Sequence, residues 1–201
     1  MIPCARRIPL AALLAAAGLL LLAALAAGPP AYAVVDEAAV IDGPSSDIVA
    51  LDGVAMAADG TGGAVYRRRV DGKVHIFASR FTGGAWQPPQ QVDRGQRYAS
   101  SWPAIGAAPD GRLVVVWVQE YGGGTQDRMY SAAVGPGATS FQDPIPFDLN
   151  VGDGSDISPS LAMNVSGQAL LTYRVITNRD LTAQGVPGGY VKEEIRLARF
   201  D

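Results

Sequence analysis

The chain has 201 residues, with 16 Lys or Arg against 19 Asp or Glu, and its formal net charge is −3. This balance makes nucleic acid a poor partner, because phosphate recognition needs clustered positive charge. The single cysteine, Cys4, lies before the first apolar run. Disulfides, thiolate zinc sites and cysteine nucleophiles are therefore not expected in the rest of the chain.

Residues 1–33 are predicted to be an export signal peptide with a helical apolar core. Arg6 and Arg7 give it a positive start, residues 8–27 are apolar without a break, and the Ala-Tyr-Ala of residues 31–33 forms a cleavage site. We therefore expect a secreted or cell-surface protein with no stable membrane span after cleavage. A retained membrane anchor is the alternative, because about 20 apolar residues are enough to cross a bilayer.

An aspartate–glycine–aromatic pattern recurs three times after this segment. In each copy the glycine follows the aspartate by 18 or 19 residues, and the aromatic residue follows the glycine by six. The copies are Asp42, Gly60 and Tyr66; Asp93, Gly111 and Trp117; and Asp148, Gly167 and Tyr173. Repeats of this kind indicate architecture before they indicate chemistry. The aromatic residue is expected to fill the space between neighbouring units rather than to bind sugar.

Each copy is predicted to contribute four short strands, because helical periodicity is absent and turn signals separate short runs of strand-like sequence. Asp59-Gly60, Asp110-Gly111 and Ser166-Gly167 mark the tight turn between the second and third strands of each unit. The units span about 38–81, 89–134 and 145–200 within a domain of residues 34–201. The predicted strands are 39–42, 51–57, 64–69 and 73–81; 89–93, 103–108, 113–119 and 128–134; and 145–148, 160–164, 169–175 and 193–200.

Four-stranded antiparallel units repeated at this spacing are typical of β-propeller blades. The apolar run Leu113–Val118 is unbroken, which favours a strand buried on both faces. The sequence therefore predicts an all-β fold, a partial β-propeller of three four-stranded antiparallel blades. A β-sandwich is the alternative, since short strands and frequent Gly and Pro suit it as well.

Four residues at and just after the end of the last strand of the first unit carry a resemblance to a known family. Ser79, Phe81, Gly83 and Trp86 resemble the Asp-box turn, SxDxGxxW, of sialidase-like propellers in secreted bacterial proteins, with phenylalanine in place of the aspartate. The resemblance implies a propeller whose turns of this type are structural. It does not imply catalysis, because the Asp-box is itself a structural turn.

Three blades are fewer than the four to eight that usually surround a propeller axis. The strand at 39–42 is expected to lie beside residues 196–200, so that the first and last strands share one blade. Three interpretations follow: a fragment of a longer propeller, a homodimer that completes a six-bladed ring, or an open arc.

Loops of unequal length are expected on the side opposite the Asp–Gly turns, and such variation usually marks the binding side of a repeat protein. A glycan or protein partner is therefore expected there. The candidates are Glu120, Tyr121, Asp127, Arg128, Arg179, Asp180, Tyr190 and Trp102, with Arg97, Tyr98, Asp153, Asp156 and Gln184 as further polar or aromatic neighbours.

An exported sialidase-like glycoside hydrolase is the second functional interpretation. It would need two facing carboxylates, or a tyrosine nucleophile with arginines that hold the substrate carboxylate. The first set could come from Glu120 with Asp127 or Asp180, and the second from Tyr121 with Arg128 and Arg179. Solvated loop charges would account for the same residues, so no catalytic residue is assigned and the enzymatic question stays open.

No cofactor or metal site is predicted. The acidic stretch of Asp148, Asn150, Asp153 and Asp156 offers calcium-type oxygen ligands, but their phase does not fit an EF-hand loop, and an ordinary turn is favoured. The only histidine, His75, falls within a predicted strand, where a packed imidazole is expected.

Overall fold

The computed structural model describes residues 38–121, 127–149, 151, 157–178 and 192–201. The chain divides into two compact units, residues 1–38 and 39–201, and the text below concerns the second. The predicted signal peptide lies outside the described residues. Among the described residues, no helix has the length and apolar character needed to cross a membrane.

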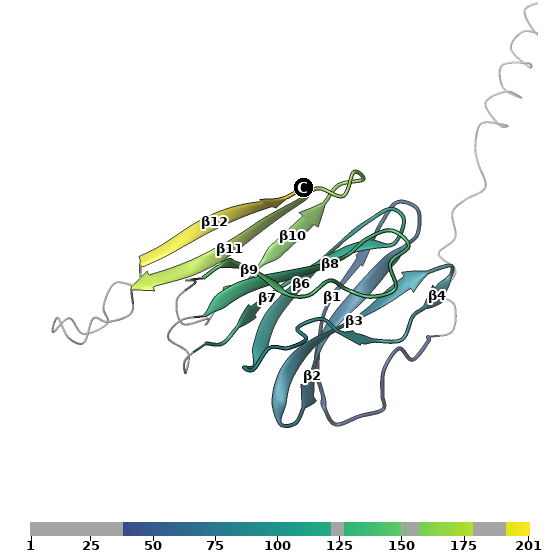
Figure 1. Ribbon diagram of the computed structural model, residues 1–201, viewed down its shortest axis with the longest axis horizontal. Coiled ribbons are helices and arrows are strands. Elements are labelled where there is room, and N and C mark those ends of the chain that lie inside the picture. The colour runs from purple at the N-terminus through teal and green to yellow at the C-terminus, as the bar shows by residue number, and fades with distance from the viewer. Residues whose placement is uncertain (1–37, 122–126, 150, 152–156, 179–191) are drawn as a thin grey trace, which may run out of the picture. The chain divides into compact units, whose positions relative to one another are not determined.

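The described part of the chain is all β and forms three antiparallel sheets, which follow one another in chain order (Figure 1). Sheet 1 contains β1 (Ile48–Met56), β2 (Gly62–Val70), β3 (Lys73–Thr82), β4 (Ala85–Trp86) and β5 (Gln90–Gln91). Sheet 2 contains β6 (Ser100–Ala108), β7 (Arg112–Gln119), β8 (Arg128–Val134) and β9 (Ile145–Asp148). Sheet 3 contains β10 (Ser160–Met163), β11 (Ala169–Asn178) and β12 (Lys192–Phe200).

Most of the predicted strands are present, and β8 and β9 have the predicted bounds. The first predicted strand of the second and of the third unit instead closes the sheet that precedes it: β5 pairs with β3, and β9 pairs with β8. The prediction of a strand at 39–42 is wrong, because these residues form an irregular segment with bends. A strand needs a partner for its backbone hydrogen bonds, and no described strand pairs with this segment.

The predicted tight turns are present and share a left-handed backbone. The φ angles are +81° at Gly60, +71° at Gly111 and +88° at Gly167. A residue with a side chain would be strained in this region, which explains glycine at the same place in every unit.

Equivalent turns of consecutive sheets lie side by side. The Asp110 N–H donates to the Asp59 carboxylate at 2.7 Å, which joins the turn of sheet 2 to the turn of sheet 1. Arg112 donates to the Ser166 carbonyl at 2.9 Å, which joins the turn of sheet 3 to sheet 2. These turns define one end of the sheets, called the turn end below.

Sheet 2 is buried on both faces because sheets 1 and 3 pack against opposite sides of it (Figure 1). Toward sheet 1, β7 presents Leu113, Val115 and Trp117 to a cluster that includes Val65, Ile76 and Ala78. Toward sheet 3, it presents Val114, Val116 and Val118 to a cluster that includes Leu171, Tyr173 and Val175. The unbroken apolar run at 113–118 therefore serves two interfaces, as predicted.

All three repeated aromatic residues are buried. Trp117 and Tyr173 pack in the clusters between neighbouring sheets, as predicted, whereas Tyr66 lies in neither cluster. The ring of Trp117 stacks on Tyr130 with centroids 6.0 Å apart, and Tyr66 stacks on Phe77 at 5.9 Å. Because the partners stand opposite each other on neighbouring strands, each stack also fixes the register of its sheet.

The repeated aspartates accept hydrogen bonds from these aromatic residues in two of the three units. The Tyr66 hydroxyl donates to Asp42 at 2.6 Å, and the Tyr173 hydroxyl donates to Asp148 at 2.7 Å. Burial, and then the neighbouring carboxylate, raises the pKa of both tyrosines well above the usual value. In these two units, the aspartate and the aromatic residue that recur at fixed spacing in the sequence are therefore joined by a tertiary hydrogen bond.

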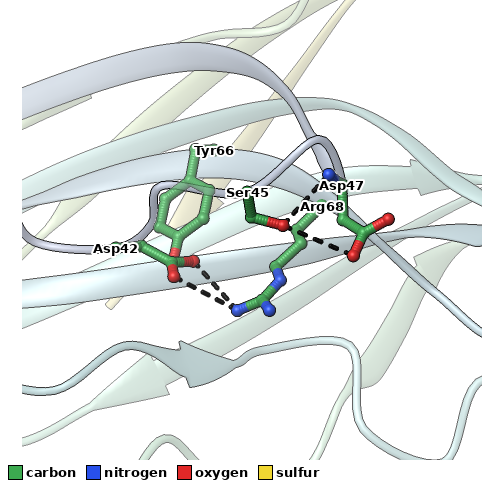
Figure 2. A network of polar contacts seen from close by, with 5 residues as sticks. All are labelled: Asp42, Ser45, Asp47, Tyr66 and Arg68. Carbon is green, nitrogen blue, oxygen red and sulfur yellow. Dashed lines mark hydrogen bonds and ion pairs between the residues drawn. The ribbon is translucent and has the colours of Figure 1, made fainter.

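An arginine completes each of these two carboxylate sites. Arg68 reaches Asp42 at 3.1 Å, and Figure 2 shows its guanidinium and the Tyr66 ring converging on that carboxylate. Arg196 reaches Asp148 at 2.8 Å. Both carboxylates therefore have a charged partner within sheet 1 or sheet 3.

The second unit differs because a tryptophan replaces the tyrosine. Its aspartate, Asp93, is fully buried and accepts a hydrogen bond from the Ser100 hydroxyl at 2.6 Å. His75 Nδ1 lies 3.0 Å from the same carboxylate. His75 is buried within β3, as the sequence predicted.

Candidate functional site: an aromatic–arginine cluster at the end of sheet 2

The end of sheet 2 opposite the turn end, called the loop end below, gathers several residues predicted from sequence. In an antiparallel sheet, the last residues of one strand lie beside the first residues of the next. The end of β7 at Gln119 therefore lies beside the start of β8 at Arg128 and the start of β6 at Ser100. Two chain segments that flank these strands, 97–99 and 120–121, meet at the same place.

Three side chains stack at the loop end and form the aromatic–arginine cluster. The guanidinium carbon of Arg128 lies 3.9 Å from the centroid of the Tyr121 ring. The Tyr98 ring lies on Tyr121 with centroids 4.9 Å apart and an interplanar angle of 57°. Tyr98 is 39 % exposed. Tyr121 and Arg128 are partly buried, so the cluster presents an exposed aromatic ring beside a partly buried cation. Cation–π attraction of about 0.5–2 kcal/mol orders the pair of Tyr121 and Arg128.

Hydrogen bonds to the backbone hold the cluster in position. The Tyr121 N–H donates to the Asp127 carboxylate at 3.1 Å, and the Glu120 N–H donates to the Ala99 carbonyl at 3.0 Å. Asp127 is fully buried. The Asp127 carboxylate thus positions the chain on either side of the loop, whereas Glu120 is exposed.

A glutamine absent from the sequence-based candidates lies beneath the cluster. Gln119 is buried, and its side-chain amide approaches the Tyr98 carbonyl at 3.5 Å. Its Oε1 has no hydrogen-bond partner among the residues that the structure describes. A polar residue ending the otherwise apolar run of β7 was the signal that could have identified it.

Trp102 lies in β6 and is 39 % exposed. It has a φ of +50°, within the pairing irregularity between Ser101 and Ala104. In the described part of the chain, no ring contact joins Trp102 to the cluster. The structure therefore brings together Tyr121 and Arg128, places Glu120 and Asp127 on the adjoining backbone, and leaves Trp102 as a separate exposed aromatic group.

The remaining candidates lie outside the described residues: Arg179, Asp180, Gln184, Tyr190, Asp153 and Asp156. Of the acidic stretch considered for calcium, Asn150 is also outside, while Asp148 contacts Tyr173 and Arg196. Within the described ranges, no group of three or more His, Cys, Asp or Glu residues is arranged to hold a metal ion.

Two of the larger grooves lie at the turn end, opposite the side on which the sequence predicts binding. The larger, about 440 Å³, lies between sheets 1 and 2 and is lined by residues that include Arg80, Asp110 and Ala138. The second, about 370 Å³, is lined by residues of sheets 2 and 3. Their position shows that the turn end is not featureless.

The charged group in the larger groove is engaged by the backbone. Arg80 is buried and donates to the Gly111 carbonyl at 2.8 Å and to the Ala138 carbonyl. Burial lowers the pKa of Arg80. Because its guanidinium binds two carbonyls in loops that connect strands of sheet 2, Arg80 joins sheets 1 and 2. The positive charge of Arg80 is therefore already engaged and less available to a ligand in this groove.

Comparison with known proteins assigns no family to the chain. No family model matches it, and no curated protein matches it. Among solved structures, a protein of unknown function from Dyadobacter fermentans DSM 18053 is similar over 78 % of this chain and 52 % of its own, with 14 % identity and a TM-score of 0.49. The polysaccharide lyase Uly1 is similar over 73 % of this chain and 39 % of its own, with 10 % identity and a TM-score of 0.46. The chain thus spans about half or less of each of these proteins.

Proposed function

We propose that residues 34–201 form a partial β-propeller of sialidase-like type, in which each sheet is one blade. Three sheets that pack in succession favour this arrangement over a sandwich of two sheets. The first strands of consecutive sheets are also neighbours, as expected around a propeller axis. A Cβ built on Gly53 in β1 would lie 3.5 Å from Ile105 in β6, and one built on Gly106 in β6 would lie 3.2 Å from Leu161 in β10.

The hairpin that resembles an Asp-box adds support for this architecture. Ser79 is fully buried, and its hydroxyl donates to the Gln87 carbonyl at 2.6 Å. Phe81 and Trp86 stand opposite each other across β3 and β4, with ring centroids 5.3 Å apart. Gly83 has a φ of +62°, in the left-handed conformation that the tight turn requires. The four residues act together as a structural turn, which is the role that the resemblance implies.

The function that the geometry supports best is that of an exported binding module whose loop end recognises a glycan. The stack of Tyr98, Tyr121 and Arg128 carries this proposal. One face of a sugar ring presents C–H groups that pack on an aromatic ring, while its hydroxyl or carboxylate groups accept hydrogen bonds from a guanidinium. Ligand sites commonly combine such an apolar surface with a few fixed polar groups.

Binding is favoured over glycoside hydrolysis because of the position of Asp127. A hydrolase needs a carboxyl group that reaches the scissile bond, whereas Asp127 is fully buried and accepts the Tyr121 N–H. Arg128 lies over the face of the Tyr121 ring, where it stabilises the stack. These contacts give both residues a structural role in a binding surface.

A glycan array probed with the purified protein tests this function directly. For any glycan retained, Tyr121→Ala is expected to weaken binding at least tenfold, which corresponds to a loss of about 1.4 kcal/mol. Trp86→Ala at the turn end is the matched aromatic control and is expected to change the affinity less than twofold. If Trp86→Ala weakened binding and Tyr121→Ala did not, the assignment of the loop end would be wrong. If the array retained no glycan, the proposal of a glycan ligand would be wrong, and a protein partner would be the remaining candidate.

A further inference from the structure

The outward faces of sheets 1 and 3 both carry exposed apolar side chains. On sheet 1, Val54 is 57 % exposed and Met56 is 54 % exposed. On sheet 3, Ile195 is 75 % exposed and Leu197 is 65 % exposed. Single exposed apolar residues are common, but groups of them on one sheet face mark an interaction surface.

The repeat indicates what covers the face of sheet 3. The aromatic positions Tyr66, Trp117 and Tyr173 stand opposite residues 77, 130 and 196 of the next strand. The residues that precede these partners are Ile76, Met129 and Ile195. Ile76 and Met129 are fully buried against the following sheet, sheets 2 and 3 respectively. Ile195 occupies the same position with no following sheet among the described residues.

The same comparison indicates what covers the face of sheet 1. Val54, Ile105 and Leu161 each precede the glycine of their tight turn by six residues. Ile105 packs in the cluster shared with sheet 1, and Leu161 packs against the cluster shared with sheet 2. Each therefore contacts the sheet that precedes its own. Val54 occupies the position that the other two sheets bury against a preceding sheet.

We propose that a second copy of this chain covers both faces. Sheet 3 of one copy packs on sheet 1 of the other, and the reciprocal contact closes a pair with two equal interfaces. The pair contains six blades, within the usual range of four to eight. This inference rests on the propeller architecture proposed above and is independent of the ligand at the loop end.

A polar contact within the chain has an equivalent at this interface. Arg80 stands opposite Gly63, and Arg199 stands opposite Leu170 at the same repeat position. Arg80 reaches across to the Gly111 carbonyl in the turn of the following sheet. The side chain of Arg199 is 59 % exposed. In the pair, Arg199 donates to the equivalent turn of the second copy, at the carbonyl of residue 60.

The segment at 39–42 also fits the pair. Asp42 accepts the Tyr66 hydroxyl as Asp148 accepts the Tyr173 hydroxyl, and Figure 2 shows Asp42 in this position. Asp148 belongs to β9, which is paired with the preceding sheet. By the same relation, residues 39–42 add a strand to β12 of the second copy. This edge supplies the backbone partner that the segment lacks among the described residues, where Val40 is 79 % exposed.

Light scattering coupled to size-exclusion chromatography, at protein concentrations of about 1 to 100 μM, tests whether the pair of copies forms in solution. The purified protein is expected to have twice the chain mass, and Ile195→Glu is expected to weaken the pair at least tenfold. Val165→Glu is the control, because Val165 is 72 % exposed but lies in a tight turn. A monomer, or a series of larger assemblies, would overturn the proposal. A monomer that Ile195→Glu destabilises would show instead that a segment of the same chain covers the face.

Cysteine cross-linking tests the register of the interface. A Cβ built on Gly63 would lie 3.3 Å from Ile105 Cδ1, and the equivalent pair between copies is Leu170 with Val54. With Cys4 replaced by Ser, the double variant Leu170→Cys/Val54→Cys is expected to form covalent dimers under mild oxidation. The control pair Val165→Cys/Val54→Cys is expected to remain uncross-linked. Equal cross-linking of both pairs, or of neither, would overturn the proposed register. Both double variants are expected to give the same result on the glycan array, because the loop end is unchanged in each.

Discussion

Tyr173→Phe removes a single hydroxyl and tests whether the aspartate–aromatic repeat stabilises the fold. The hydroxyl donates to Asp148 at 2.7 Å, and the Tyr173 side chain is buried. A hydrogen bond to a charged group contributes about 1.5–3 kcal/mol. Asp148 keeps its ion pair with Arg196 at 2.8 Å, so the lower end of that range, about 1.5 kcal/mol, is expected.

Urea unfolding followed by circular dichroism measures this loss. The midpoint is expected to fall without a change in the slope m, because the phenylalanine ring preserves the packing. Tyr130→Phe is the matched control: Tyr130 is also buried, but its hydroxyl makes no hydrogen bond with another residue in the described ranges. If both variants lost the same free energy within about 0.5 kcal/mol, the hydrogen bond would not be the reason for the repeat.

Three further predictions concern the same contacts. Folding raises the pKa of Tyr66 and Tyr173, so above about pH 10 the unfolded chain loses the two hydroxyl protons before the folded chain does. The free energy of unfolding should therefore fall by at most about 1.4 kcal/mol per pH unit for each tyrosine. If the double phenylalanine variant showed the same dependence of stability on pH as the wild type, this reasoning would be contradicted. Gly111→Ala should cost at least about 1 kcal/mol more than Gly60→Ala in urea unfolding, because both have positive φ but only the Cβ at 111 would meet Arg80, at 2.8 Å; equal losses would refute the contact. Arg80→Met should destabilise the protein by about 1.5–3 kcal/mol in the same assay, since two carbonyls lose a charged donor, and wild-type stability would show that the contact between sheets is dispensable.

The strands and turns were predictable because local sequence determines them. Alternating apolar residues and glycines at fixed places gave the bounds of β8 and β9 and the turns at Gly60 and Gly111. The burial of β7 on both faces followed from its unbroken apolar run. These features depend on backbone conformation and side-chain periodicity within a few residues.

Features that depend on distant partners were not predictable in detail. The segment at 39–42 has strand-like residues, but no described strand of this chain pairs with it. Arg80 reaches a carbonyl 31 residues away, and nothing in the local sequence indicates that contact. At the loop end, the sequence placed Tyr121 and Arg128 on one side, whereas their stacking depends on the path of the chain around Asp127.

Chemical-shift mapping by NMR, with a glycan selected on the array, tests the proposed binding surface most directly. The backbone amides of Tyr98, Glu120, Tyr121 and Arg128 are expected to show the largest shifts on titration, because they surround the aromatic–arginine cluster. Shifts confined to residues of the turn-end groove, such as Arg80, Asp110 and Ala138, would contradict the account and place the ligand at the opposite end of the sheets.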